Sequence, residues 1–258
     1  MSIWGWPFWR KNIGDIKIIM KLFTDDIIKF KNKIEHQENF SFSKYADGEW
    51  AVMKNIPINN KEFWFDPNNK LDIIRRNRLI ESFQYKNDRY YVGISCPCCQ
   101  GIDTFNEMKQ FSGQDEDHLT WANLWVNANY KYYVENIIPL FSKRPVILFC
   151  NEDSKIENLP FLPYIVKRLK KNSWQYNWPV IEETKFMIES FGIKDMLFLF
   201  CCGPFGNILC HQLTEYEPNN TYLDIGSTLN PYLQSAGFDR FYYMGDNVFS
   251  RMECVWPS

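Results

Sequence analysis

The sequence lacks the long hydrophobic runs, the basic charge and the histidines on which several classes of protein depend. Its most apolar segment, residues 196–202, is far shorter than the about 20 residues of a membrane-spanning helix. A formal net charge of −2 provides no overall field to gather polyanions, so nothing indicates nucleic acid as a partner. The 3 histidines lack an accompanying G-x-S-x-G elbow, which argues against a Ser-His hydrolase.

The chain also begins without the apolar core and small-residue cleavage site of a secretory signal. Together with 8 cysteines, this favours an intracellular, cytoplasmic protein whose thiols stay reduced. No internal repeat, low-complexity tract or Gly/Ser linker divides the sequence. We therefore expect an aromatic N-terminal extension over residues 1–23 and a single α/β domain over residues 24–258.

Aromatic residues are abundant, at 17% of the chain, and several stand beside basic residues at the N-terminus. This group comprises Trp4, Trp6, Phe8, Trp9, Arg10 and Lys11. Such a segment can pack on its own domain, contact a membrane peripherally, or join two copies of the chain as a homo-oligomer. Packing on its own domain is the commonest outcome for a single apolar segment.

Helical patterns and short apolar runs alternate along the rest of the chain. Helices are predicted over residues 24–34, 69–83, 120–141, 160–171, 180–191 and 208–213. Strands are predicted over residues 89–95, 146–150, 196–202 and 221–226. This alternation predicts a Rossmann-like α/β fold with a mainly parallel sheet flanked by helices.

Ligands of such folds bind beyond the carboxyl ends of the strands, where three candidate motifs fall. The first is Asp47-Gly48-Glu49, directly after an alternating apolar segment. Gly48 permits a tight turn on which both carboxylates share one Mg²⁺ or Mn²⁺ ion and, through it, two phosphate oxygens. An ordinary polar turn is the alternative, because D-x-E often arises by chance.

The other two motifs follow later strands. Gly203 and Pro204 form a turn into a helix, whose first N–H groups can face a diphosphate or a ribose. Asp224 can accept hydrogen bonds from sugar hydroxyls or act as a base, Gly226 and Ser227 can contact the donor, and Ser227 can cap the next helix. Purely structural turn and capping roles remain open for both motifs.

Two further groups of residues have more than one interpretation. The loop holding Cys96, Cys98 and Cys99 is either a zinc site, with His118 or Cys202 as a distant ligand, or a set of small buried thiols. Aromatic and amide residues alternate from Trp121 to Tyr130, where they can either contact a sugar or pack in the core.

The order of these motifs resembles the glycosyltransferases of the GT-D fold, a Rossmann-like group first defined as a domain of unknown function. The resemblance spans about residues 24–245 and rests on F-S-x-x-x-D-G-E-W at residues 42–50, G-P at 203–204 and Y-L-D-I-G-S at 222–227. It implies that Asp47 and Glu49 hold the metal, and that Gly203-Pro204 and Asp224 to Gly226 match the family's Gly-Pro and Asp-Ile-Gly segments.

The resemblance implies a metal-dependent, hexosyltransferase-like enzyme. It would move a sugar from a nucleoside diphosphate sugar to an acceptor hydroxyl on a glycan, a protein or another molecule. For a reaction that inverts the anomeric configuration, the base expected from the sequence is a nearby carboxylate, Asp224 or Glu152. A non-catalytic nucleotide- or glycan-binding module, a nucleotide phosphohydrolase and a zinc-stapled structural protein are the alternatives from other classes.

Overall fold

The computed structural model describes residues 21–60, 63–234, 240–243, 246–248 and 250–257. Most of the N-terminal extension, including its aromatic residues from Trp4 to Trp9, lies outside the described residues. The first described helix, α1, begins at Phe23 and ends at Glu35. None of the helices within the described residues is long and apolar enough to cross a bilayer.

Seven strands in the described part of the chain form one sheet, in which each neighbouring pair runs parallel. Their order in space is β5-β4-β1-β9-β8-β6-β7. They are β1 Ser41–Lys44, β4 Tyr90–Ile94, β5 Leu119–Trp121, β6 Val146–Asn151, β7 Ile165–Leu169, β8 Leu197–Phe200 and β9 Thr221–Asp224. The predicted Rossmann-like α/β fold with a parallel sheet is therefore confirmed. The strands β2 Ile58–Asn59 and β3 Trp64–Phe65 form a separate antiparallel hairpin.

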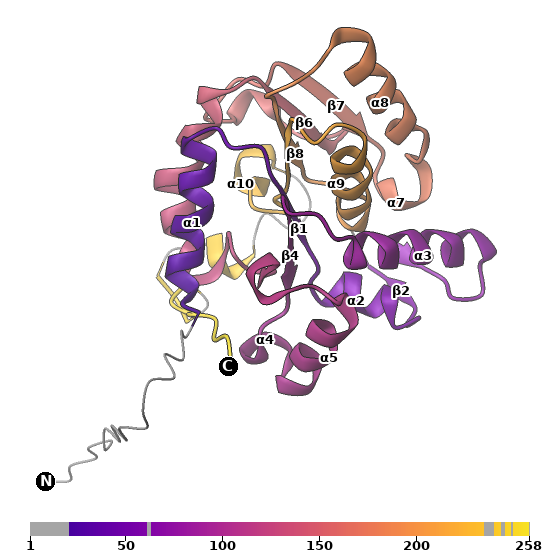
Figure 1. Cartoon of the computed structure of the whole chain (residues 1–258), viewed down its shortest axis with the longest axis vertical. Helices are drawn as coiled ribbons and strands as arrows, with labels where there is room; N and C mark the ends of the chain where they lie inside the picture. Colours follow the sequence, from indigo (N-terminus) through magenta and orange to yellow (C-terminus); the bar gives the residue numbers. More distant parts are fainter. Residues whose placement is uncertain (1–20, 61–62, 235–239, 244–245, 249, 258) are drawn as a thin grey trace, which may run out of the picture.

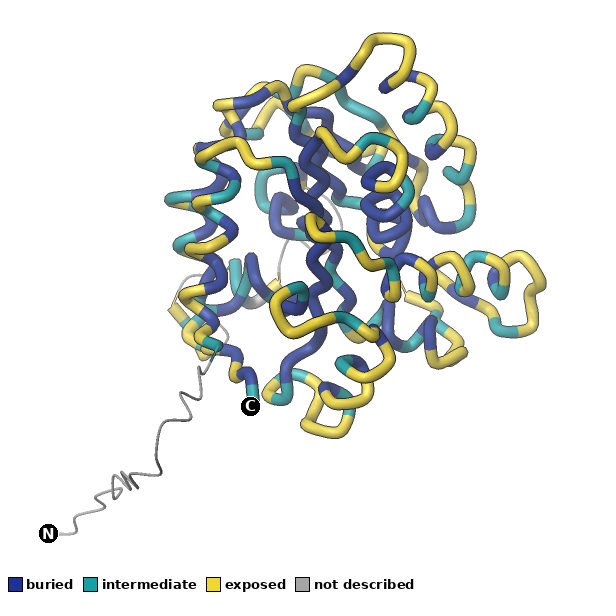
Figure 2. Tube along the Cα trace, viewed as in Figure 1, coloured by how far each residue is buried: buried dark blue, intermediate teal, exposed yellow. Residues whose placement is uncertain are grey.

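The further α-helices of the described residues are α2 Asp47–Met53, α3 Lys70–Gln84, α4 Pro97–Gln100, α5 Ile102–Ser112, α6 Tyr130–Tyr132, α7 Ser173–Tyr176, α8 Pro179–Phe191, α9 Pro204–Tyr216 and α10 Asn230–Leu233. Helices cover both faces of the sheet, with α1 and α10 on one side and α3, α8 and α9 on the other (Figure 1). Because successive strand side chains point to opposite faces, Leu197 and Leu199 enter one core and Phe198 and Phe200 the other. Apart from the edge strand β7, the strands of the sheet are accordingly buried along most of their length, while the outer helix faces are exposed (Figure 2).

The helix predicted over residues 160–171 is wrong, because this segment contains the edge strand β7. Ile165 pairs with Ile147 of β6, and the pairing continues in parallel to Leu169. The apolar spacing of the segment imitates a helix, but Pro160 and Pro163 disfavour helical backbone before them. Ile165 and Val166 are β-branched and pack well on a sheet, so strand pairing prevails.

The helix predicted over residues 120–141 is only partly correct. Its first residues belong to β5, where Thr120 lies opposite Gly93 of β4. Helical backbone starts at Asn127 and continues through short 3-10, α and π turns to Lys143. Trp121 is fully buried in the strand and Asn123 follows it, so the early part of the segment reaches the carboxyl edge of the sheet.

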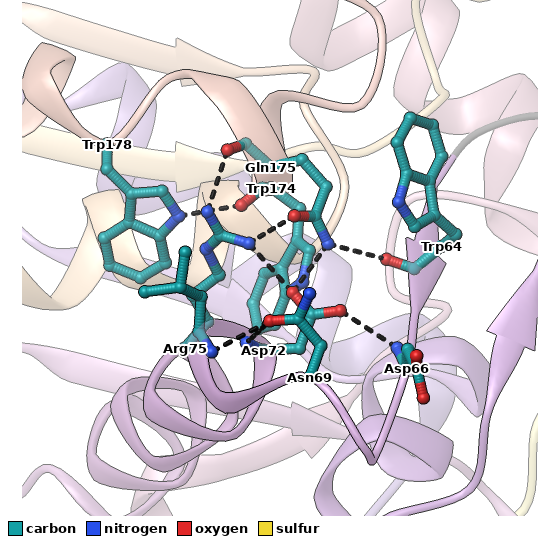
Figure 3. Close-up of polar contacts among 9 residues, drawn as sticks. Trp64, Asp66, Asn69, Asp72, Arg75, Trp174, Gln175 and Trp178 are labelled. Atoms are coloured by element: carbon teal, nitrogen blue, oxygen red, sulfur yellow. Dashed lines mark hydrogen bonds and ion pairs between the residues drawn. The ribbon is translucent and has the colours of Figure 1, made fainter.

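A buried ion pair fixes α7 against α3 and the β2–β3 hairpin (Figure 3). Asp72 Oδ1 lies 2.8 Å from Arg75 Nη1 and also accepts a hydrogen bond from Gln175 Nε2 at 2.6 Å. Asp72 Oδ2 accepts the Asp66 backbone N–H at 2.9 Å, and Arg75 Nη2 donates to the Gln175 carbonyl at 2.9 Å. The network therefore holds the chain just after Ser173, at the carboxyl end of β7.

Candidate functional site

A cavity of about 850 Å³ opens at the carboxyl edge of the sheet. The segments that follow β1, β5, β6, β7, β8 and β9 line it, together with the β2–β3 hairpin and the later residues Arg240 and Tyr242. The volume lies within the range of about 300–1,000 Å³ that is usual for small-molecule sites. The three motifs predicted from the sequence thus meet at one cavity, through Asp47 to Glu49, Gly203, and Gly226 with Ser227.

Asp47 and Glu49 lie in the first turn of α2, and not on a free turn between two elements as the sequence suggested. Asp47 is exposed, whereas Glu49 is buried, and Glu49 Oε2 accepts the Ala46 backbone N–H at 2.9 Å. That hydrogen bond caps the helix, and acidic groups suit the positive end of the helix dipole. Both carboxylates line the cavity and supply hard oxygen ligands, so they fit the expected Mg²⁺ or Mn²⁺ ion.

Lys44, the last residue of β1, lines the cavity and feels the charge of two carboxylates, those of Glu49 and Asp224. Burial alone would lower the pKa of Lys44, but attraction to Glu49 and Asp224 outweighs it, and the pKa is raised. Burial raises the pKa of Asp224 to about 7, against the opposing attraction of the Lys44 ammonium group. Lys44 therefore stays a cation at neutral pH and presents a fixed positive charge to the cavity.

Asp224 itself lies beneath the cavity surface and is 1% exposed. Its Oδ1 accepts the Gly226 backbone N–H at 3.1 Å, and its Oδ2 accepts Asn207 Nδ2 at 3.3 Å. The same Asn207 amide donates to the Lys44 carbonyl at 2.6 Å, so it joins the ends of β1 and β9. Asp224 is therefore not among the residues that line the cavity.

Because Gly226 has no side chain, the Lys44 side chain has room to pass close to its backbone. Its φ of +53° lies in the left-handed region, and a Cβ at this position would collide with Lys44 Cε. Ser227, the next residue, does not cap α10 as expected, since Leu229 is the N-cap. The Ser227 Oγ instead lies 2.9 Å from the Tyr242 hydroxyl, which links the loop after β9 to the C-terminal part of the chain.

Polar groups without partners lie in the wall of the cavity. Both amide atoms of Asn172 and Trp125 Nε1 are buried and make no hydrogen bond within the described structure. An unsatisfied buried polar group costs about 1–3 kcal/mol. Because both residues line the cavity, a bound ligand is a natural source of the missing partners, reached by a small rotation of either side chain.

Several cations surround the same space. Lys44 lies at the end of β1, Lys170 and Lys171 follow β7, and Arg240 comes from the C-terminal part. Lys44 and Asn172 were missed by the sequence reasoning. Lys44 carried one usable signal, since it ends a strand immediately before the acidic motif, but Asn172 carried none.

The remaining sequence candidates divide between the cavity and the core. Asn123, Trp125 and Asn127 line the cavity, whereas Trp121 is fully buried in β5. Gly48 and Gly203 also line it. Pro204 is buried as the first residue of α9, and Glu152 is exposed outside the lining.

Comparison with solved structures found two of the domain of unknown function 1792. One, a selenomethionine-substituted structure, has a TM-score of 0.54 and 19% identity over 78% of this chain and 77% of that one. The other, described as showing that this highly conserved domain has a distinct glycosyltransferase fold, has a TM-score of 0.53 and 19% identity over 80% of this chain and 79% of that one. No family model and no curated protein matches the sequence. At the level of the fold, these likenesses confirm the resemblance expected from the motif order.

Proposed function

We propose that this protein is a glycosyltransferase that binds a nucleoside diphosphate sugar in the cavity and transfers the sugar to an acceptor hydroxyl. The observation that carries the proposal is the joint presence of the Asp47 and Glu49 carboxylates and the Lys44 ammonium group at one cavity. The carboxylates suit a divalent cation, and the ammonium group suits a phosphate oxygen. A likeness in fold to a domain described as having a glycosyltransferase fold supports the same assignment.

The rest of the lining suits the other parts of such a donor. Lys170, Lys171 and Arg240 add positive charge around the space that the diphosphate would occupy. Tyr242, which is half-buried, offers aromatic surface to a base or a sugar ring. Gly203 has no atom within 4 Å of where a Cβ would be, so its backbone is open to close approach by a ligand.

In the proposed reaction the acceptor oxygen forms a bond to the anomeric carbon of the donor sugar. The bond between that carbon and the diphosphate oxygen breaks, and the electron pair leaves with the nucleoside diphosphate. The acceptor hydroxyl loses its proton to a base. Asp47 and Glu49 would hold Mg²⁺ or Mn²⁺, and a bound divalent cation stabilises the charge that develops on the leaving diphosphate.

Among the described residues that line the cavity, Lys44 is suited to meet that developing charge directly. Its raised pKa keeps it protonated, and its side chain passes over Gly226. Asp224 has a pKa of about 7, which suits a base at neutral pH. Because Asp224 is 1% exposed and lies outside the cavity lining, we assign it the electrostatic attraction that helps to hold Lys44 and leave the identity of the base open.

A screen of nucleoside diphosphate sugars by thermal unfolding, with and without Mn²⁺, tests the binding half of the proposal. A donor that binds the folded state raises the melting temperature by mass action, and we expect a larger rise with Mn²⁺ than without it. If no nucleoside diphosphate sugar raises the melting temperature under either condition, the proposal fails. Release of phosphate or sugar phosphate at a steady rate, independent of any acceptor, would identify a phosphohydrolase reaction instead.

A further inference from the structure

Four cysteines gather at a second place in the fold, next to the cavity but outside its lining. The Sγ atoms of Cys96, Cys98, Cys99 and Cys254 all lie within 4.8 Å of one another. The first three come from the loop after β4 and from α4, and the fourth comes from the C-terminal segment. His118 and Cys202, the more distant ligands considered from the sequence, are not part of this group.

The spacing of the four sulfurs suits one tetrahedral metal ion. With Zn–S bonds of about 2.3 Å, the sulfurs of a tetrahedral site lie about 3.8 Å apart, inside the observed limit. Cys96 Sγ and Cys98 Sγ, at 2.8 Å, are closer than this and must separate by about 1 Å around an ion. Cys98 is exposed on the short helix α4, so its side chain has room to move by that amount.

The surroundings of the thiols resemble the outer shell of a thiolate site more than an apolar core. Asn123 Nδ2 donates to Cys99 Sγ at 3.1 Å, and Asn127 Nδ2 donates to Cys254 Sγ at 3.5 Å. Amide donors of this kind stabilise negative charge on sulfur and orient the ligands of a bound ion. Simple core packing would require neither two amide donors nor the exposed thiol of Cys98.

We propose that Cys96, Cys98, Cys99 and Cys254 bind one Zn²⁺ ion as a tetrathiolate that fastens the C-terminal segment to the body of the protein. An iron–sulfur cluster would separate its cysteines further, since irons and sulfides stand between them. A single ion, in contrast, draws all four sulfurs to one centre. Binding releases the thiol protons and leaves four thiolates on the ion.

The zinc site would also steady one wall of the cavity. Asn123 and Asn127 line the cavity with the same side chains that donate to the cysteine sulfurs. Around Cys254 the segment packs closely, since Trp256 lies edge-on to Trp121 at 4.9 Å between ring centroids. Figure 1 shows the C-terminus ending beside α4. The ion would therefore join two segments that are far apart in the sequence, each bonded to an asparagine of the cavity wall.

Metal content of the protein purified without chelators, measured by mass spectrometry, tests the assignment. We expect about one zinc per chain, and reconstitution with Co²⁺ should give the visible bands of a tetrahedral tetrathiolate. Cys98→Ser changes only an exposed ligand, so the fold should survive while zinc affinity, measured by competition with a chromophoric chelator, falls more than about tenfold. Cys150→Ala, which removes a buried thiol of β6 outside the group, should keep the full zinc content.

Four results would overturn the zinc site. Two concern the metal: zinc at background level together with no cobalt bands, and iron in place of zinc. The other two are a disulfide between Cys96 and Cys98, found by thiol counting of the purified protein, and an unchanged zinc affinity in Cys98→Ser.

Limited proteolysis tests the fastening role separately. Removal of zinc by a chelator should increase the rate of cleavage within residues 246–257 at least about tenfold, because that segment opens more often once the ion is removed. Equal cleavage rates with and without zinc would show that the ion does not hold the segment. Because neither experiment uses donor or acceptor, failure here leaves the proposed glycosyltransferase activity untouched.

Discussion

Replacement of Gly226 by alanine tests whether Lys44 is held over the loop after β9. At this position φ is +53°, and the added Cβ would run into Lys44 Cε. Gly192, the C-cap of α8, is the matched control, since its φ is +59° and a Cβ there meets nothing within 4 Å. Both variants bear the cost of a left-handed alanine, and only Gly226→Ala also displaces the lysine.

The expected loss of stability has two parts, the strain of a left-handed alanine and the displacement of Lys44. A non-glycine residue in the left-handed region loses about 1–2 kcal/mol, which sets the expected loss for Gly192→Ala. The end of the Lys44 side chain can move aside, so weakening its attraction to Glu49 and Asp224 adds no more than about 1 kcal/mol. Gly226→Ala should therefore lose about 1–3 kcal/mol in total.

Urea denaturation followed by tryptophan fluorescence measures both stabilities, and calorimetric titration of a donor found by the thermal screen measures affinity. We expect at least a tenfold loss of donor affinity in Gly226→Ala, about 1.4 kcal/mol, and no change in Gly192→Ala. An unchanged donor affinity in Gly226→Ala, or an equal loss of affinity in Gly192→Ala, would refute the reasoning.

Three further variants probe the surroundings of the cavity. Burial raises the pKa of Asp224 from 3.8 to about 7, so the folded chain binds this proton more tightly than the unfolded chain does. The free energy of unfolding therefore falls as pH rises from about 4 to 7. Asp224→Asn should flatten this fall in a series of denaturations at different pH, and an unchanged slope against pH would contradict the assignment. Asp72→Ala leaves Arg75 partly buried without its carboxylate and should cost about 3–5 kcal/mol in urea denaturation, whereas a loss below 1 kcal/mol would show that the pair in Figure 3 does not stabilise the fold. Asn172→Gly removes two amide atoms that have no partners, and glycine tolerates the φ of +57° at this position. The free energy of unfolding should therefore change by less than about 1 kcal/mol, while donor affinity should fall about tenfold. Unchanged affinity would exclude Asn172 from the binding site.

The central strands could be predicted from the sequence because they are buried on both faces. Residues 146–150 and 196–202 are continuous apolar runs, and such runs are typical of a parallel sheet between two helical layers. The edge strands β5 and β7 are harder to recognise in the sequence, because each pairs with one strand only. In β7 the polar residues Lys167 and Arg168 also interrupt the apolar pattern.

The motifs of the cavity were found for a related reason. A parallel sheet brings the carboxyl ends of its strands to one edge, so Asp47, Gly203 and Gly226 could be placed together without knowledge of their contacts. What the order of elements cannot supply is the direction of individual side chains. Two such details are the hydrogen bond from the Ala46 N–H to Glu49 and the burial of Asp224 outside the cavity lining, which depend on rotamers and packing.

The fourth cysteine of the proposed zinc site shows the same limit at longer range. Cys254 lies far along the chain from Cys99, in a C-terminal segment with little regular structure. No periodic pattern predicts where such a segment packs. The packing of Trp256 on Trp121 and the hydrogen bond from Asn127 to Cys254 show where the segment lies and so which cysteines Cys254 approaches.

The most direct test of the proposed function compares two aspartates that both stand in the exposed first turn of a helix. Asp47 begins α2 at the cavity, and Asp103 lies in the first turn of α5 outside its lining. The measurement is Mn²⁺-dependent release of nucleoside diphosphate from the donor in the presence of acceptor hydroxyls. Asp47→Asn should reduce the rate at least about a hundredfold, since it removes a ligand of the cation that stabilises the leaving group, while Asp103→Asn retains the full rate. Equal rates in the two variants, or release that does not depend on Mn²⁺, would contradict the metal-dependent glycosyltransferase assignment.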